Sequence, residues 1–289
     1  MNQADEMKGK VCLVTGGNTG IGRATATELA KRGATVVLLC RSPERGEAAR
    51  SAIAAETGNP KVELLVCDLA SLASVRSAAG EFLARHPRLD VLVNNAAIFA
   101  PARETTAEGF EKTFVTNYLS HFLLTNLLLE RLKASAPSRI VNVASKTGNA
   151  KLDFDDLQSM NGKFSFMTAV PRSKLSQVMF TRELARKLEG TGVTVNALHP
   201  GLVKTPLLDE MNGLLRMMIH LFSMPPEKGA RTAVFLATSP DVAQVSGKLF
   251  EKNREVPLSG QVTEAAATQR LWAESAQLAG LASASPEAR

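Results

Sequence analysis

The segment of this sequence best suited to chemistry is a glycine-rich turn that begins at Gly16. It follows the apolar run Val11–Thr15 and precedes a helical pattern near 21–32, so it joins a buried strand to a helix. Glycines in such a turn let the backbone approach a pyrophosphate, and the free N–H groups of the helix N-terminus then face the phosphates. We therefore expect phosphate contacts from the turn, namely from Gly16, Asn18, Thr19, Gly20, Ile21 and Gly22.

The end of the next apolar run, Thr35–Cys40, indicates which dinucleotide fits. A site that binds NAD places a carboxylate there for the ribose hydroxyls, and this carboxylate repels a 2′-phosphate. Here the run is followed by Arg41 and Ser42, with no acidic residue at this position. Because a guanidinium forms charge-assisted hydrogen bonds with phosphate, the pair favours NADP(H) over NAD.

Short apolar runs alternate with longer amphipathic stretches along most of the chain. Further strands are expected at Val62–Cys67, Val91–Asn94, Arg139–Ala144, Val193–Leu198 and near Lys248–Phe250. Further helices are expected near 44–57, 71–85, 107–133 and 172–189. Continuous apolar strands are buried on both faces, and their alternation with helices gives right-handed βαβ units. The predicted fold is one α/β domain over residues 1–289, a Rossmann-type doubly wound parallel sheet of about seven strands flanked by helices.

Several motifs occur in the order that one protein family requires. The turn has the form T-G-x-x-x-G-I-G, and S-K-L-S-Q-V-M-F-T-R-E-L resembles the segment that carries an active-site Y-x-x-x-K. From about residue 8 to residue 282 the chain closely resembles the short-chain dehydrogenases/reductases, in particular their retinol-dehydrogenase-like branch. The resemblance implies further cofactor contacts after the third, fourth and sixth strands: Asp68 and Leu69; Asn95, Ala96 and Ala97, the last in place of a glycine; and Pro200, Gly201, Val203 and Thr205.

The resemblance also implies a catalytic set from which one member is missing. Asn117, Ser145 and Lys174 match the family's asparagine, serine and lysine. In the family the asparagine holds a water of the proton relay and the serine steadies the developing oxyanion. The lysine binds the cofactor ribose and lowers the pKa of a tyrosine. That tyrosine is the general acid/base of the reaction. That tyrosine belongs four residues before Lys174, where this chain has Val170, and a hydrocarbon neither donates nor accepts a proton.

The surroundings of Val170 carry two further expectations. Pro171 disfavours helical backbone at the residue before it and suits the first position of a helix, so Val170 is expected just outside the helix. A replacement proton donor is sought in His121, four residues after Asn117 on one helix face, or else in water or the substrate. Tyr118, the only tyrosine, is the weaker alternative, because adjacent helix positions point about 100° apart.

Two segments depart from the alternation of strands and helices. The polar stretch 147–168 is expected to be an active-site loop, and the Met-rich apolar stretch 205–222 a lid over the substrate. Both emerge at the carboxyl ends of strands, where open α/β sheets bind ligands. The alternative for 205–222 is packing on the core or on a partner subunit. The tail 282–289 is expected to be frayed.

Composition argues against several classes of partner and compartment. The net charge is +6, but the basic residues are spread among acidic ones, which disfavours nucleic-acid and membrane partners. Cys12, Cys40 and Cys67 form no C-x-x-C pair and lie in apolar segments, so we expect buried thiols, with no disulfide and no metal. A polar start and the short apolar stretch Phe122–Leu129 favour a soluble, cytoplasmic protein. Analogy with the family adds a homo-oligomer as an expectation.

Three functions are compatible with these residues. The favoured one is an NADP(H)-dependent oxidoreductase that acts on a lipophilic carbonyl or alcohol without the usual tyrosine. General acid–base catalysis typically contributes about 10²–10⁴-fold, so such an enzyme would be slow but not inert. The second is a non-redox isomerase, dehydratase or cyclase, in which Ser145 and Lys174 polarise a substrate beside bound NADP. The third is a non-catalytic NADP-binding protein.

Overall fold

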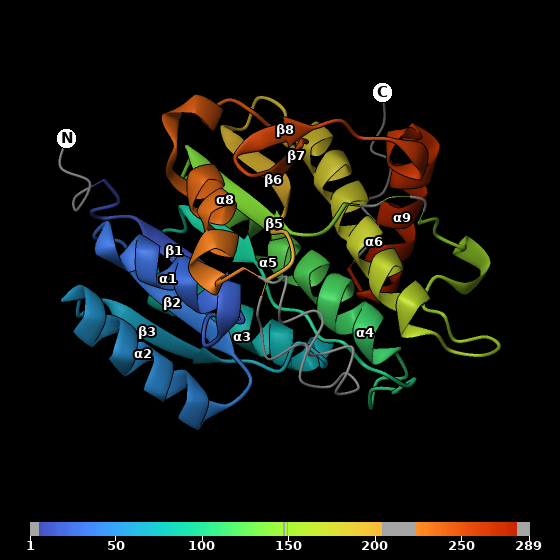
Figure 1. The fold of residues 1–289 in the computed structure, drawn as a ribbon, viewed down its shortest axis with the longest axis horizontal. Helices are drawn as coiled ribbons and strands as arrows, with labels where there is room; N and C mark the ends of the chain where they lie inside the picture. The colour runs from blue at the N-terminus through green and yellow to red at the C-terminus, as the bar shows by residue number, and fades with distance from the viewer. Residues whose placement is uncertain (1–5, 147, 149, 204–223, 282–289) are drawn as a thin grey trace.

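The computed structural model describes residues 6–146, 148, 150–203 and 224–281, and one twisted sheet lies at its centre (Figure 1). In the described residues this sheet has eight strands in the order β3-β2-β1-β4-β5-β6-β7-β8. All neighbours are parallel except β7 and β8, which are antiparallel. The strands are β1 (Val11–Thr15), β2 (Thr35–Cys40), β3 (Val62–Val66), β4 (Val91–Asn94), β5 (Ser138–Val143), β6 (Val193–His199), β7 (Leu249–Glu251) and β8 (Arg254–Val256).

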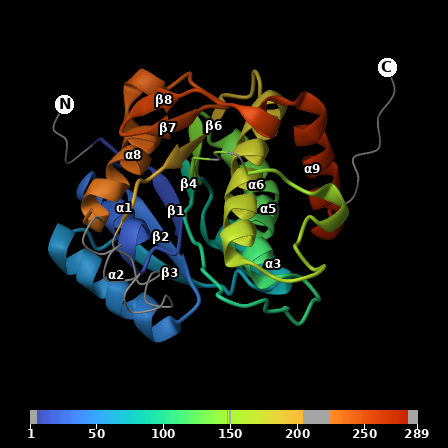
Figure 2. The same cartoon turned by 45° about the vertical axis from the view of Figure 1, so that its right-hand side comes forward.

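Helices cover both faces of the sheet, as Figure 2 shows from the side. One face carries α1 (Gly20–Lys31), α2 (Pro43–Thr57) and α8 (Pro226–Thr238). The other face carries α3 (Leu72–Arg85) and α6 (Phe166–Lys187), and α9 (Ala265–Leu278) packs against the outside of α6. Between α3 and α6 lies one continuous helical run made of α4 (Lys112–Phe114), η2 (Val115–Leu119) and α5 (Ser120–Ala134). Short 3₁₀ turns are η3 (Phe154–Asp156), η5 (Pro240–Val242) and η6 (Gly260–Thr263).

Alternate residues of each central strand enter two separate hydrophobic cores. In β1, Leu13 packs into the core beneath α3, α5 and α6, whereas Cys12 and Val14 pack into the core beneath α1, α2 and α8. Successive side chains of a strand point to opposite faces, so a continuous apolar run can fill both cores. The Rossmann-like, doubly wound fold predicted from these runs is confirmed.

Among the described strands, β8 is the one that the sequence pattern did not indicate. It joins β7 through a tight turn at Lys252 and Asn253, both with positive φ (49° and 61°). Paired positive φ values fit the right-handed twist of a two-residue hairpin. Arg254 and Glu255 are exposed at the sheet edge, so β8 lacks the apolar run by which the other strands were found.

Helix α6 begins earlier than expected and includes both Val170 and Pro171. The prediction that Val170 lies outside the helix is therefore wrong. Pro171 lies in the second turn, where its missing N–H costs the single hydrogen bond to the carbonyl of Met167. Met167 is 68% exposed, so water can satisfy that carbonyl, and the buried face of α6 keeps the helix in place.

The remaining expectations concern the cysteines, the lid and tail segments, and membrane spans. All three cysteines are buried and free, as predicted. The expected lid 205–222, Thr205 and the tail 282–289 lie outside the described residues. Among the helices that the structure does describe, none has the length and apolar character of a membrane span.

Candidate active site

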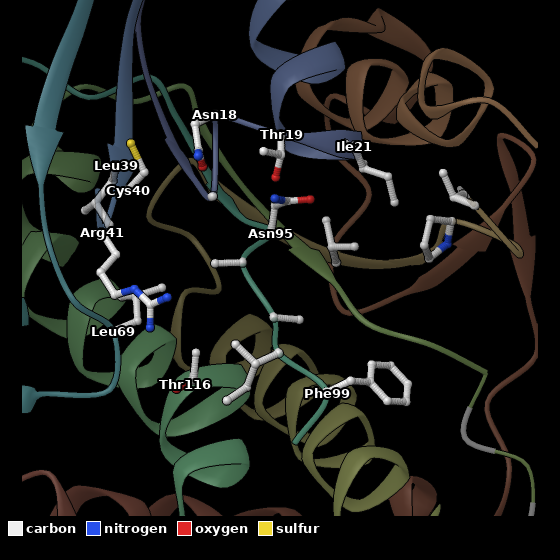
Figure 3. A pocket seen from close by; sticks show the side chains of 18 of the residues that line it. Asn18, Thr19, Ile21, Leu39, Cys40, Arg41, Leu69, Asn95, Phe99 and Thr116 are labelled. Carbon is white, nitrogen blue, oxygen red and sulfur yellow. The ribbon is translucent and has the colours of Figure 1, made fainter. Parts of the chain in front are cut away.

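A cleft of about 590 Å³ opens at the carboxyl ends of the central strands (Figure 3). The sheet order reverses between β1 and β4, because the chain adds β2 and β3 on one side of β1 and β4 to β7 on the other. Such a switch point leaves a crevice in which α/β sheets bind ligands. Arg41 and Phe99 lie on opposite sides of the cleft, with Asn95 between them.

The glycine-rich turn forms the upper wall of the cleft with Gly16, Asn18, Thr19, Gly20 and Ile21. Gly16 and Gly20 have positive φ (65° and 53°), which glycine adopts without strain. Gly22 lies behind the lining, where a Cβ would approach the carbonyl oxygen of Gly16 to 2.2 Å. Thr19, the N-cap of α1, makes no side-chain capping bond, so the helix N-terminus keeps free N–H groups beside the cleft. This geometry fits a pyrophosphate.

Two guanidinium groups line the cleft here, from Arg41 after β2 and from Arg45 in α2, and both side chains are exposed. The predicted residue Ser42 also lines the cleft, but its Oγ caps α2 by accepting the N–H of Arg45 (3.2 Å). The sequence analysis missed Arg45, although the Ser42 cap places it in the first turn of α2, close to Arg41. Asp68 and Leu69 line the same region, as the resemblance implied.

Thr15 fixes the central wall of the cleft. Its Oγ1 accepts the backbone N–H groups of Asn95 (2.8 Å) and Ala96 (3.0 Å), and its carbonyl accepts Nδ2 of Asn95 (2.8 Å). These bonds place Asn95, Ala96 and Ala97 along the lining.

Asn117 supports this wall from behind and does not itself line the cleft. It lies in the π-helical segment η2, a form that often occurs at functional sites. Its Oδ1 accepts the N–H of Ile98 (2.7 Å) and its Nδ2 donates to the carbonyl of Ile98 (3.1 Å). Asn117 therefore holds the backbone from which Ile98 and Phe99 face the cleft.

The two candidate replacements for the tyrosine are both buried in structural contacts outside the cleft lining. His121 lies between Oγ1 of Thr15 (3.1 Å from Nε2) and Nε2 of Gln177 (2.8 Å from Nδ1). Burial lowers the pKa of His121 to about 3, with a further contribution from the charge of Lys174, so the ring is neutral. Tyr118 is fully buried, with its hydroxyl 2.7 Å from Oγ of Ser275. Neither side chain is placed to reach a substrate.

The end of the cleft beside β5 and α6 is lined by Ser145, Lys174 and Val170. Lys174 is half-buried, and its Nζ donates to the carbonyl of Val143 (2.9 Å). Burial lowers the pKa of this amine to about 8. Val170 is 7% exposed and lies one helical turn before Lys174. Ser145 lies two residues after the end of β5, with its Oγ 3.4 Å from Nδ1 of His199.

The remaining predicted residues lie at the mouth of the cleft. Pro200, Gly201 and Val203 line it, and Gly201 has a positive φ of 81°. None of the described residues between 148 and 168 contributes to the lining. That segment instead flanks the cleft, because Phe166 packs edge-on against Phe99 (6.4 Å between ring centroids).

Comparison with known proteins identifies the family of the chain. The family model described as short chain dehydrogenase matches residues 10–213. The chain is 46% identical to retinol dehydrogenase 13 of Mus musculus over 285 residues, which cover 96% of this chain and 85% of that protein.

Two solved structures share the fold. One is an uncharacterized protein of Mycobacterium paratuberculosis (TM-score 0.75, 32% identity, 94% of both chains covered). The other is a protein of Beutenbergia cavernae, assigned as an NAD(P)-dependent gluconate 5-dehydrogenase and solved with NADP (TM-score 0.68, 31% identity, 86% of this chain and 97% of that chain covered). The doubly wound sheet, the glycine-rich turn at Gly16, Ser145 and Lys174 together are typical of nucleotide-dependent oxidoreductases. The chain belongs to the short-chain dehydrogenase family.

The depressed pKa of Lys174 predicts a pH-dependent stability difference between the wild type and Lys174→Met. The pKa of the Lys174 amine falls from 10.5 in the unfolded chain to about 8 in the folded protein. Between these two pH values the unfolded chain binds more protons than the folded protein. The stability of the wild type relative to the variant therefore rises as the pH rises from 8 to 10.5. We expect a rise of at most about 3 kcal/mol from pH 8 to pH 10, and none from pH 6 to pH 7.

The measurement is urea unfolding of both proteins across this pH range. Lys61→Met, at an exposed lysine, serves as the matched control. A difference between wild type and Lys174→Met that is the same at pH 7 and pH 10 would show that the amine keeps its ordinary pKa.

Proposed function

We propose that this protein is an NADP(H)-dependent oxidoreductase for a lipophilic alcohol or carbonyl compound, with Val170 in place of the family's catalytic tyrosine. One observation carries the proposal. A single cleft joins the glycine-rich turn and Arg41 at one end to Ser145, Lys174 and Val170 at the other.

The cofactor proposal rests on the positive charge of Arg41 after β2 and of Arg45 in the first turn of α2. Arg41 and Arg45 both line the cleft where the adenosine ribose of a dinucleotide would lie, if its pyrophosphate occupies the N-terminus of α1. Two guanidinium groups favour a 2′-phosphate there, and they favour it more strongly than Arg41 and Ser42 would. The Beutenbergia cavernae protein with the same fold was solved with NADP.

The substrate proposal rests on the apolar character of the opposite end. The cleft that Ser145 lines is also lined by the apolar side chains of Ile98, Phe99, Val170 and Leu202. Side chains of this kind bind hydrocarbon, with few polar groups to set the orientation. The relatives named retinol dehydrogenase 13 and 14 support a lipophilic alcohol or aldehyde as the substrate class.

The chemistry retained by the site is orientation and charge stabilisation. When bound, the nicotinamide supplies or accepts a hydride at the substrate carbon. Ser145 is placed to donate a hydrogen bond to the substrate oxygen, on which negative charge develops during reduction. Lys174 adds a positive charge in the same region. Val170 fills the place of the family's acid/base without a proton to give, so turnover is expected to be slow.

Replacement of Arg41 is expected to weaken the preference for the 2′-phosphate, with Arg45 left in place. Arg41→Ala should raise the Kd of NADPH about 10- to 100-fold, because a hydrogen bond to a charged group contributes about 1.5–3 kcal/mol. The Kd of NADH should change less than about threefold, since NADH has no 2′-phosphate. Fluorescence titration with both nucleotides measures the two constants.

A matched control is Arg50→Ala, at an arginine outside the cleft lining that pairs with Glu47. Equal losses of NADPH and NADH binding in Arg41→Ala would contradict the NADP assignment.

Introduction of a tyrosine is expected to accelerate the proposed reaction. Val170→Tyr should raise kcat for the reduction of all-trans-retinal by NADPH about 100-fold, because it restores a general acid on the helix face that carries Lys174. Val170→Phe adds the ring without the hydroxyl and should give no such gain. Retinol formation and the loss of NADPH absorbance are measured together.

The same assay separates the alternatives. Conversion of substrate without oxidation of NADPH would support a non-redox enzyme. NADPH binding with no conversion by the wild type or by Val170→Tyr, with this and other lipophilic carbonyls, would indicate a protein that only binds the nucleotide.

A further inference from the structure

A second histidine, His199, lies beside Ser145 at the catalytic end of the cleft. His199 is the last residue of β6, and Ser145 comes two residues after the end of β5. The parallel register pairs Val143 with Leu198, and Ala144 donates its N–H to the carbonyl of Leu198, so the two chains leave the sheet side by side. Oγ of Ser145 and Nδ1 of His199 are consequently 3.4 Å apart, and both residues line the cleft.

Two charged groups act on this imidazole, and a third lines the same cleft. Glu251 of β7 pairs with His199 in the sheet register, and its carboxylate forms an ion pair with Lys146 (2.8 Å), which follows β5. Lys174 of α6 lines the same cleft. Burial lowers the pKa of His199, the charge of Lys146 lowers it further, and Glu251 acts in the opposite direction. The ring is therefore neutral at pH 7, which is the state of a general base.

A serine hydroxyl alone is a poor proton carrier at neutral pH, because its own pKa is far too high. A neighbouring imidazole changes this, since it can take up the hydroxyl proton or replace it. Catalytic hydrogen bonds are often long in the absence of substrate, so a separation of 3.4 Å is compatible with proton transfer in the complex.

We propose that Ser145 and His199 form the acid/base dyad of this site and carry the proton in place of the family's tyrosine, less efficiently than a tyrosine at position 170 would. The proposal rests on the oxidoreductase function proposed above. In alcohol oxidation, the substrate C–H bond breaks and its hydride reduces NADP⁺, while the hydroxyl proton passes to Oγ of Ser145. The Ser145 proton moves to Nδ1 of His199 at the same time, and His199 then releases a proton to water. Reduction of the carbonyl runs through the same steps in reverse.

The dyad predicts opposite pH profiles for the two directions. Oxidation needs the neutral imidazole, so its kcat should rise with pH through the His199 pKa, which lies below 6.5, and then level off. Reduction needs the imidazolium, so its kcat should fall about tenfold per pH unit above that pKa.

The test uses all-trans-retinol with NADP⁺ and all-trans-retinal with NADPH as probes. His199→Gln should lower kcat about 100-fold with less than threefold change in KM, and it should flatten both profiles. His86→Gln, at a buried histidine outside the cleft lining, is the matched control and should leave the profiles unchanged. Thermal melting checks that each variant folds.

A double-mutant comparison separates proton transfer from a structural role. In the Val170→Tyr background the tyrosine supplies its own proton path, so His199→Gln should cost less than about threefold in kcat. An equal loss in both backgrounds would show that His199 only supports the fold and would overturn the proposal. A wild type that does not turn over although Val170→Tyr does would overturn it as well, because the native site would then lack a proton carrier.

A readout that needs no turnover distinguishes failure of the dyad from failure of the proposed function. If neither the wild type nor Val170→Tyr oxidises retinol although NADPH binds, the oxidoreductase proposal fails. The dyad is then judged by ¹⁵N NMR titration of the His199 ring, with His199→Gln to identify its signals. Ser145→Ala should move the Nδ1 resonance and the titration midpoint of His199, and an unchanged titration would overturn the dyad.

Discussion

The cleft depends on one buried hydrogen-bonding group, the hydroxyl of Thr15 at the end of β1. It accepts two backbone N–H groups of the segment that follows β4 and contacts His121 of α5. His121 in turn contacts Gln177 of α6, the helix that carries Val170 and Lys174. Through these hydrogen bonds, Thr15 at the end of β1 positions both the segment after β4 and helix α6, which line the cleft. Partly satisfied buried polar networks are costly, so such a chain specifies a single arrangement.

This network explains why a valine at position 170 leaves the rest of the site intact. The hydrogen bonds that place Lys174 and the Asn95–Phe99 segment do not involve the side chain at 170. Binding and positioning are therefore separable from proton transfer in this scaffold. In the proposed function, a tyrosine at position 170 would add a proton donor to a site whose other residues are already in place, and His199 lines the same cleft.

Much of the fold and half of the site could be predicted from the sequence, for physical reasons. Strands that are buried on both faces consist of consecutive apolar residues, which makes them visible in the sequence. The turn of a strand–turn–helix pyrophosphate site needs glycine where the backbone has positive φ, as at Gly16 and Gly20. Edge strand β8 is exposed and carries no such signal. Pro171 was misread because local preference is overridden by the packing of α6. The contact between Ser145 and His199 arises from strand register, which links residues 54 positions apart and leaves no mark on local spacing.

The most direct test of this account is a single-turnover reaction of the wild-type protein with all-trans-retinal and NADPH deuterated at the nicotinamide C4. Mass spectrometry of the product reports whether the hydrogen that reaches the substrate carbon comes from the nucleotide. The account predicts one deuterium in each molecule of retinol formed and an equal amount of NADP⁺. Product without deuterium, formed while the NADPH stays reduced, would contradict it.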